Sequence, residues 1–175
     1  MSDRPAAPID PRVDVGHVHL KVADIDRALA FWRDALGFEV MARGREVVFL
    51  SAGGYHHHIA LNAWRSRGGD PPPPGTTGLF HVALRYPTRP ALATAVARLV
   101  AHGVRLDGAA DHGVSEAVYL HDPDRNGVEL SWDRPRERWP RDGAGGILMA
   151  TDPLDLDGLL ASATTGERDP GVRRD

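Results

Sequence analysis

Two stretches of the chain repeat one pattern and decide its fold: Gly16-His17-Val18-His19-Leu20 and Phe80-His81-Val82-Ala83-Leu84. Apolar and polar residues alternate in the first stretch, which is typical of a strand with one buried face. A second pair, Ile59-Ala60-Leu61 and Val128-Glu129-Leu130, superposes in the same way. Each repeat is too small to bury its own sheet face, so the pattern predicts that the two halves pair.

Each repeat predicts a strand, a helix and three further strands. Asp24 is expected to cap a helix whose apolar face runs from Ile25 to Leu36, and Thr88 is expected to cap the second helix. The expected strands begin near Val13 and cover 38–42, 47–51 and 56–62 in the first repeat, then 80–86, 104–106, 116–120 and 128–132 in the second. The predicted fold class is α+β: two paired βαβββ modules form a curved mixed β-sheet around a metal pocket, with the helices outside.

The repeat also predicts the domain organisation. Residues 13–133 are expected to form one domain, with modules 13–64 and 78–133 joined by a stiff linker, 65–77, that contains four consecutive prolines. Residues 1–12 are expected to be flexible. The tail, 134–175, is expected to be partly disordered, with a short docked helix within 152–160 and disorder over the last ten residues.

Composition excludes several function classes. The 175 residues carry a net charge of -3, which offers no basic face for nucleic acid, and no apolar run is long enough to span a membrane. The chain has no cysteine, so any metal site must use histidine, carboxylate or water. We therefore expect a cytoplasmic protein with no nucleic-acid or membrane partner.

Three residues are candidate metal ligands. His17 and His81 occupy equivalent positions in the two repeats, and Glu129 lies within an otherwise apolar strand. A lone carboxylate there would be costly to bury without a cation. One histidine on a strand is more often a hydrogen-bonded residue than a ligand, but the repeat equivalence favours ligands. Two imidazoles and one carboxylate form the facial triad that suits Fe(II) and leaves positions open. The fourth equivalent position is Ala60, which cannot bind metal.

These motifs resemble the vicinal oxygen chelate superfamily. The resemblance rests on His17-Val18-His19-Leu20, on Leu36-Gly37-Phe38, and on the run from Asp122-Pro123 through Gly127-Val128-Glu129. The superfamily includes glyoxalase I, extradiol ring-cleaving dioxygenases and antibiotic-resistance proteins. The resemblance implies the paired-module fold and a divalent metal, with Fe(II) expected first and Mn(II) or another divalent ion as the alternative.

Three further residues resemble the extradiol dioxygenase branch and are candidate catalytic residues. The resemblance implies that His57 is an acid–base residue beside the oxygen site, that His112 contacts substrate, and that Tyr119 is the active-site tyrosine ten residues before the glutamate ligand. Strict strand alternation would instead place His58 on the face of Ala60, so this choice stays open. The sequence departs from the family pattern at Ala110 and at Arg125, where glycine or proline is usual.

The predicted function is therefore a metal-dependent extradiol dioxygenase that acts on a small aromatic, catechol-like diol with O2. A homodimer is compatible with the superfamily. A glyoxalase-like isomerase or lyase is the first alternative, although Ala60 lacks the usual fourth ligand. A non-enzymatic drug-binding resistance protein is the second, although such proteins usually lack metal ligands.

Overall fold

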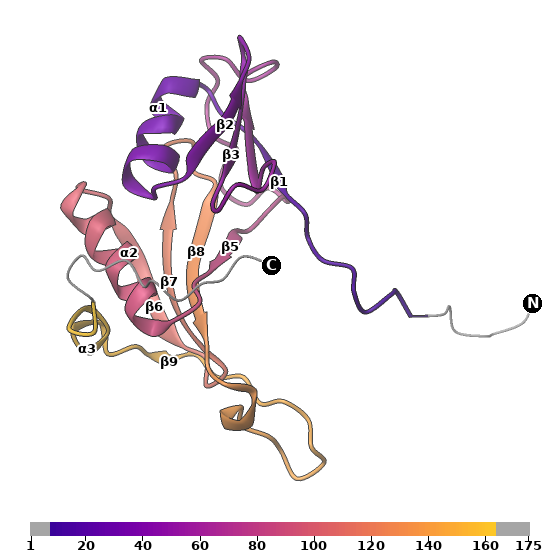
Figure 1. Cartoon of the computed structure of the whole chain (residues 1–175), viewed down its shortest axis with the longest axis vertical. Coiled ribbons are helices and arrows are strands. Elements are labelled where there is room, and N and C mark those ends of the chain that lie inside the picture. Colours follow the sequence, from indigo (N-terminus) through magenta and orange to yellow (C-terminus); the bar gives the residue numbers. More distant parts are fainter. Residues whose placement is uncertain (1–7, 164–175) are drawn as a thin grey trace, which may run out of the picture.

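The computed structural model describes residues 8–163 and contains the two predicted βαβββ modules (Figure 1). The first module comprises β1 (Val18–Lys21), α1 (Ile25–Leu29), η1 (Ala30–Ala35), β2 (Glu39–Arg43), β3 (Val47–Ser51) and β4 (Ile59–Asn62). The second comprises β5 (Val82–Arg85), α2 (Arg89–Ala101), β6 (Leu106–Asp111), β7 (Ser115–His121) and β8 (Gly127–Asp133). The elements η2 (Arg136–Arg138), β9 (Asp152–Pro153) and α3 (Leu156–Leu160) follow. The α+β class and the internal repeat are confirmed.

Strand pairing is the same in both modules. The first sheet has the order β1-β4-β3-β2 and the second the order β5-β8-β7-β6-β9. The first and last strands of each module pair in parallel, with Val18 opposite Ile59 and Val82 opposite Val128. Among the described residues, no strand of one module pairs with a strand of the other, so the curved sheet expected from the sequence consists of two sheets, and β9 extends the second.

Local signals determine where the two long helical segments begin and end. The Asp24 side chain accepts a hydrogen bond from the Arg27 amide at 2.7 Å, and Thr88 caps α2 as predicted. The helix expected to run to Leu36 becomes π-helical after Leu29, where the Leu36 amide bonds the Phe31 carbonyl at 2.9 Å. Gly37 then adopts a φ of 88°, a conformation that glycine permits without steric strain.

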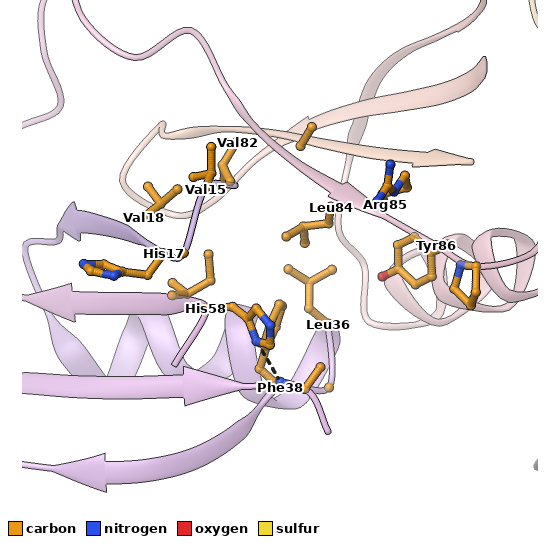
Figure 2. Close-up of a pocket in the computed structure, with 16 residues that line it drawn as sticks. Val15, His17, Val18, Leu36, Phe38, His58, Val82, Leu84, Arg85 and Tyr86 are labelled. Atoms are coloured by element: carbon orange, nitrogen blue, oxygen red, sulfur yellow. Dashed lines mark hydrogen bonds between the residues drawn. The ribbon is translucent and has the colours of Figure 1, made fainter. Parts of the chain in front are cut away.

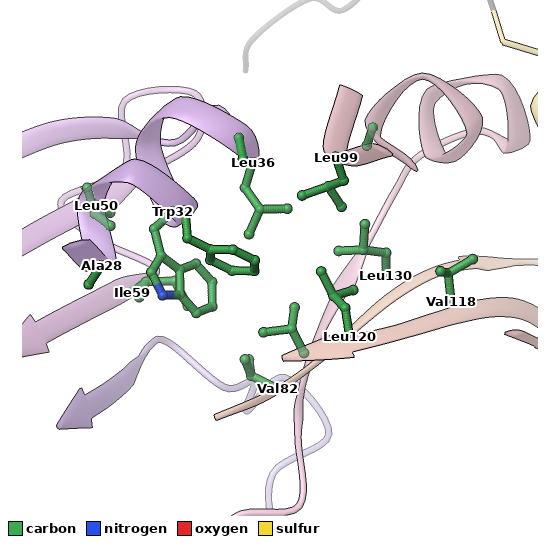
Figure 3. Packing of buried hydrophobic residues seen from close by; sticks show 14 of the residues in the cluster. Ala28, Trp32, Leu36, Leu50, Ile59, Val82, Leu99, Val118, Leu120 and Leu130 are labelled. Carbon is green, nitrogen blue, oxygen red and sulfur yellow. The ribbon is translucent and has the colours of Figure 1, made fainter. Parts of the chain in front are cut away.

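One hydrophobic core draws on both modules (Figure 3). Trp32 and Leu36 of the first module point toward Leu99 of α2 and toward Leu120 and Leu130 of the second sheet. The helices lie on one side of the sheets, as Figure 1 shows, which leaves the opposite sheet faces for the candidate site residues.

The turn 122–127, which we call the clasp, ties the modules together. Asp122 is buried and accepts hydrogen bonds from the amides of Asp124 and Asn126 and from the Asn126 side chain, each at 2.9 Å. The indole Nε1 of Trp32, in the first module, donates to the same carboxylate at 3.3 Å. Burial raises the pKa of Asp122, although these hydrogen bonds oppose the shift. Asp124 completes the clasp by accepting from the Ala23 amide at 2.9 Å and from Arg27.

The second strand of the second module was predicted too early in the sequence. A strand at 104–106 was expected, but β6 covers Leu106–Asp111 and pairs with both β7 and β9. The predicted docked helix is present as α3, whose Leu159 is buried. The disorder predicted for the last ten residues lies outside the described residues, as do residues 1–7 of the flexible segment predicted for residues 1–12. No helix within residues 8–163 combines the length and the apolar character needed to cross a bilayer.

Candidate functional site

Two of the three predicted metal ligands are in contact. His81 directly precedes β5, Glu129 lies in the neighbouring β8, and their Nε2 and Oε2 atoms are 2.8 Å apart. Glycine at position 127 allows the backbone of β8 to lie close to Phe80 and His81. A Cβ atom there would lie 2.0 Å from the Phe80 carbonyl oxygen and 3.0 Å from the Cβ of His81. The Glu129 side chain is only 14% exposed, so its contact with the imidazole lies largely away from solvent.

Tyr119 and His112 lie beside this pair. Tyr119 is directly opposite Glu129 in the β7–β8 register, and its ring centroid is 5.9 Å from that of His81. Its hydroxyl oxygen is 2.5 Å from Nε2 of His112. Burial raises the pKa of Tyr119, and the Glu129 carboxylate raises it further, so the side chain is a neutral phenol at physiological pH. These four residues (His81, Glu129, Tyr119 and His112) form the second-module group.

His17 and His57 form a separate contact in the first module. Their ring centroids are 4.4 Å apart, and His57 also meets the ring of Phe49 at 5.0 Å. Desolvation lowers the pKa of His57, and the neighbouring histidines, His17 first, lower it further. His58 instead bonds the Ser51 hydroxyl at 3.1 Å. The structure therefore places His57, not His58, beside the candidate ligand His17. These three residues (His17, His57 and Phe49) form the first-module group.

Two members of each group occupy equivalent positions in the repeat: His17 corresponds to His81, and Phe49, opposite Ala60, corresponds to Tyr119, opposite Glu129. His19 is opposite Ala60 in the first module and Ala83 is opposite Glu129 in the second, so Ala60 is the counterpart of Glu129. Ala60 is fully buried and offers no ligand atom. Within the described part of the chain, no three histidine or acidic side chains are grouped closely enough to hold a metal ion. His81 and Glu129 are thus brought together, whereas His17 contacts His57.

A cavity of about 610 Å³ lies between the modules (Figure 2). Its wall is mainly apolar and includes Leu36, Phe38, Leu84 and Tyr86. His17 also lines the cavity, together with His58, but no member of the second-module group does. The cavity is therefore adjacent to only one of the predicted ligands.

Several polar contacts around these groups were not predicted from the sequence. The clasp residues were recognised as a motif, but nothing in the local pattern indicated that they bond Trp32 and Ala23. An ion-pair network of Glu116 with Arg89 and Arg134, at 2.7 and 3.2 Å, was also missed. The contact of His112 with the backbone of Ala150 has no side-chain signal that could have revealed it.

Comparison with known proteins agrees with this architecture. Residues 14–130 match the family model of the Glyoxalase/Bleomycin resistance protein/Dioxygenase superfamily. The chain is 39% identical over 154 residues to catechol-2,3-dioxygenase of Bacillus subtilis (strain 168). The matched region covers 85% of this chain and 52% of that protein. It is 30% identical over 125 residues to biphenyl-2,3-diol 1,2-dioxygenase 3 of Rhodococcus globerulus, covering 71% of this chain and 65% of that one. The chain thus spans about half to two thirds of the length of these relatives.

Solved structures share the fold. A lactoylglutathione lyase from Agrobacterium tumefaciens superposes with a TM-score of 0.55 at 24% identity, covering 70% of this chain and 96% of that one. A glyoxalase/dioxygenase from Nostoc punctiforme superposes with a TM-score of 0.60 at 18% identity, covering 77% of this chain and all of the other. These likenesses concern the fold alone. From the family match and the repeated modules, we conclude that the chain belongs to the Glyoxalase/Bleomycin resistance protein/Dioxygenase superfamily.

Proposed function

We propose that this protein is a metal-dependent extradiol dioxygenase that opens a catechol-like ring with O2. The observation that carries the proposal is the second-module group, in which His81 contacts Glu129 at 2.8 Å and Tyr119 lies directly opposite Glu129 in the strand register. The names of the dioxygenase relatives support the same reaction class. The proposed substrates are a small aromatic diol and O2, and the overall reaction adds both oxygen atoms to the ring-opened product.

We propose that these residues would hold a divalent ion once His17 approaches the His81–Glu129 pair, because no three such side chains within residues 8–163 are already grouped closely enough to hold one. Ligand atoms that share an ion at about 2.0–2.2 Å lie roughly 3 Å from one another, which is close to the 2.8 Å separation of the His81 and Glu129 atoms. We propose His17 as the third ligand because it occupies the position in the first module that His81 occupies in the second. Two imidazoles and one carboxylate favour Fe(II), with Mn(II) or another divalent ion as alternatives. When bound, the ion would lower the pKa of a diol hydroxyl and bring diol and O2 together.

The remaining residues have roles that follow from their surroundings. The lowered pKa of His57 keeps its imidazole neutral near pH 7, so it can accept a proton from the diol and return it later. Tyr119 remains a neutral phenol, and its oxygen can form a hydrogen bond with a substrate hydroxyl. Tyr119 is positioned by the pairing of β7 with β8, and His57, in the loop between β3 and β4, is positioned by ring contacts with His17 and Phe49.

Metal content tests the proposed ligands. His17→Ala, His81→Ala and Glu129→Gln should each strip most of the bound metal from protein reconstituted anaerobically with Fe(II), whereas wild type should hold about one ion per chain by elemental analysis. His102→Ala, which changes a histidine at the C-terminal cap of α2, is the control and should bind as wild type does. Undiminished metal in all three variants would refute the ligand set.

Oxygen uptake tests the reaction. Fe(II)-loaded protein should consume one O2 per diol across a panel of catechols and yield a coloured semialdehyde cleaved beside the hydroxyl pair. A glyoxalase-like lyase is the competing activity, but Ala60 provides no fourth ligand. Isomerisation of a thiohemiacetal without diol-dependent oxygen uptake would favour that alternative over the dioxygenase.

A further inference from the structure

Both ring nitrogens of His112 have a partner. Nδ1 lies 2.7 Å from the carbonyl oxygen of Ala150, and the Ala150 amide donates back to the carbonyl of His112 at 3.1 Å. Nε2 lies 2.5 Å from the hydroxyl oxygen of Tyr119. The imidazole is therefore held between the backbone of the C-terminal segment and the candidate catalytic tyrosine.

These partners determine the tautomer of His112. A carbonyl oxygen can only accept a hydrogen bond, so Nδ1 must carry the proton that faces Ala150. A neutral imidazole has a single N–H, which leaves Nε2 as an acceptor. The hydrogen bond from Tyr119 to His112 is consequently donated by the phenol. The opposite tautomer would leave Nδ1 and the Ala150 carbonyl facing each other with no proton between them.

The segment that supplies the Ala150 carbonyl is anchored on both sides of His112. We call residues 140–153 the strap. At its start, Pro140 packs against Gly113, where an added Cβ would lie 3.1 Å from the proline ring. At its end, β9 pairs with β6, with Asp152 opposite Asp111. Arg134 lies just before the strap and forms a 2.6 Å ion pair with Asp111, next to His112. The strap lies outside the part of the chain that matches the family model.

We propose that the strap is a positioning element for the candidate active site. It fixes His112 in the Nδ1–H tautomer, and His112 then draws the hydroxyl proton of Tyr119 toward itself. The phenol oxygen is thereby left to accept a hydrogen bond from a substrate hydroxyl. In this proposal His112 acts through Tyr119, whereas the family resemblance predicted a contact of His112 with the substrate. The consequence for turnover rests on the proposed function, whereas the tautomer does not.

The tautomer can be measured in the full chain by long-range ¹H–¹⁵N correlation of histidine side chains, with and without diamagnetic Zn(II). At pH 8, above the ordinary histidine pKa of about 6.5, His112 should show a protonated Nδ1 and an unprotonated Nε2. Its signals are assigned by their loss in His112→Gln. A protonated Nε2, with or without a proton on Nδ1, would overturn the proposal.

Two variants separate the strap from the tyrosine. Ala150→Pro removes the amide that donates to His112 and should shift the ring toward a mixture of tautomers, whereas Ala144→Pro, at the tip of the strap, should not. Tyr119→Phe should keep the Nδ1–H form because the Ala150 carbonyl is unchanged. A wild-type tautomer in folded Ala150→Pro would refute control by the strap. Loss of the Nδ1–H form in Tyr119→Phe would also refute control of the tautomer by the strap. The Tyr119→Phe measurement does not depend on whether Ala150→Pro folds.

A double-mutant cycle tests whether His112 acts through Tyr119. Tyr119→Phe and His112→Ala should each lower kcat for diol-dependent oxygen uptake by roughly 10²-fold, the scale of a positioned acid–base group. If one residue acts through the other, the double variant should be no slower than the slower single variant. Losses that multiply would overturn the proposed coupling. Absence of oxygen uptake in wild type would refute the proposed function and leave the tautomer result intact.

Discussion

At the scale of single residues, Arg125 shows how a departure from the family pattern affects local geometry. It is the only non-glycine residue within 8–163 with a positive φ, at 65°. The left-handed conformation costs an L-residue about 1–2 kcal/mol, which explains why glycine suits this position. Arg125→Gly should therefore raise the free energy of unfolding by about 0.5–1 kcal/mol, since the freedom that glycine gains in the unfolded chain offsets part of the relief.

Urea denaturation measures this change. Arg65→Gly is the matched control, because Arg65 is an exposed linker residue without a positive φ. It should leave stability unchanged or lower it. A loss of stability in Arg125→Gly equal to that of the control would show that the clasp does not strain Arg125.

His57 is the residue whose environment best separates catalysis from metal binding. It contacts the proposed ligand His17 by its ring and is not itself proposed as a ligand. His57→Asn should leave metal content intact and lower turnover by roughly 10²–10⁴-fold, the usual contribution of acid–base catalysis. His58→Asn is the matched control and should retain turnover, because His58 bonds Ser51. The reverse result would show that His58 is the acid–base residue.

At the scale of elements, the clasp is a part of the second module that stabilises the first. Asp122 accepts four hydrogen bonds, one of them from Trp32. An asparagine has one acceptor oxygen and would turn its amide toward donors. Asp122→Asn should therefore lower the free energy of unfolding by about 1–3 kcal/mol, the cost of buried groups left without a partner. Asp142→Asn, on the exposed tip of the strap, should lose less than about 0.5 kcal/mol in the same urea titration. Equal losses would contradict the stabilising role of the clasp.

The sequence predicted the elements that have a local signal. The β3 strand was predicted at its observed bounds because Val47–Ser51 is an apolar run between turns. The β6 strand was misplaced because Gly108, Ala109 and Ala110 have no alternating pattern, so this strand depends on pairing with β7 and β9. The π-helical turn after Leu29 has no sequence signal of its own.

At the scale of the whole molecule, the repeat explains both the success and the limit of predicting the site. It identified His17 as equivalent to His81 and Ala60 as equivalent to Glu129, and the register in both modules agrees. It could not predict that His17 contacts His57, or that a backbone carbonyl of the strap fixes His112. These contacts depend on how distant segments pack, which a local pattern does not encode.

The shared core predicts that the two modules unfold as one unit. Trp32 is fully buried in the first module, yet its indole bonds Asp122 and it belongs to a core that includes Leu130 of the second. A variant with Trp32 as its only tryptophan should show the same urea midpoint by fluorescence as by far-UV circular dichroism. Leu130→Ala in that background should lower the free energy of unfolding by about 2–5 kcal/mol, because it opens a cavity in the core.

The decisive comparison is the response of Trp32 to this distant change. If the core is shared, the fluorescence midpoint of Trp32 should fall together with the circular dichroism midpoint, although Leu130 lies in the other module. Leu148→Ala serves as the control, since Leu148 is 48% exposed on the strap and should shift neither midpoint. A Trp32 transition that keeps its midpoint in Leu130→Ala, while the circular dichroism signal becomes biphasic, would show that the modules fold independently.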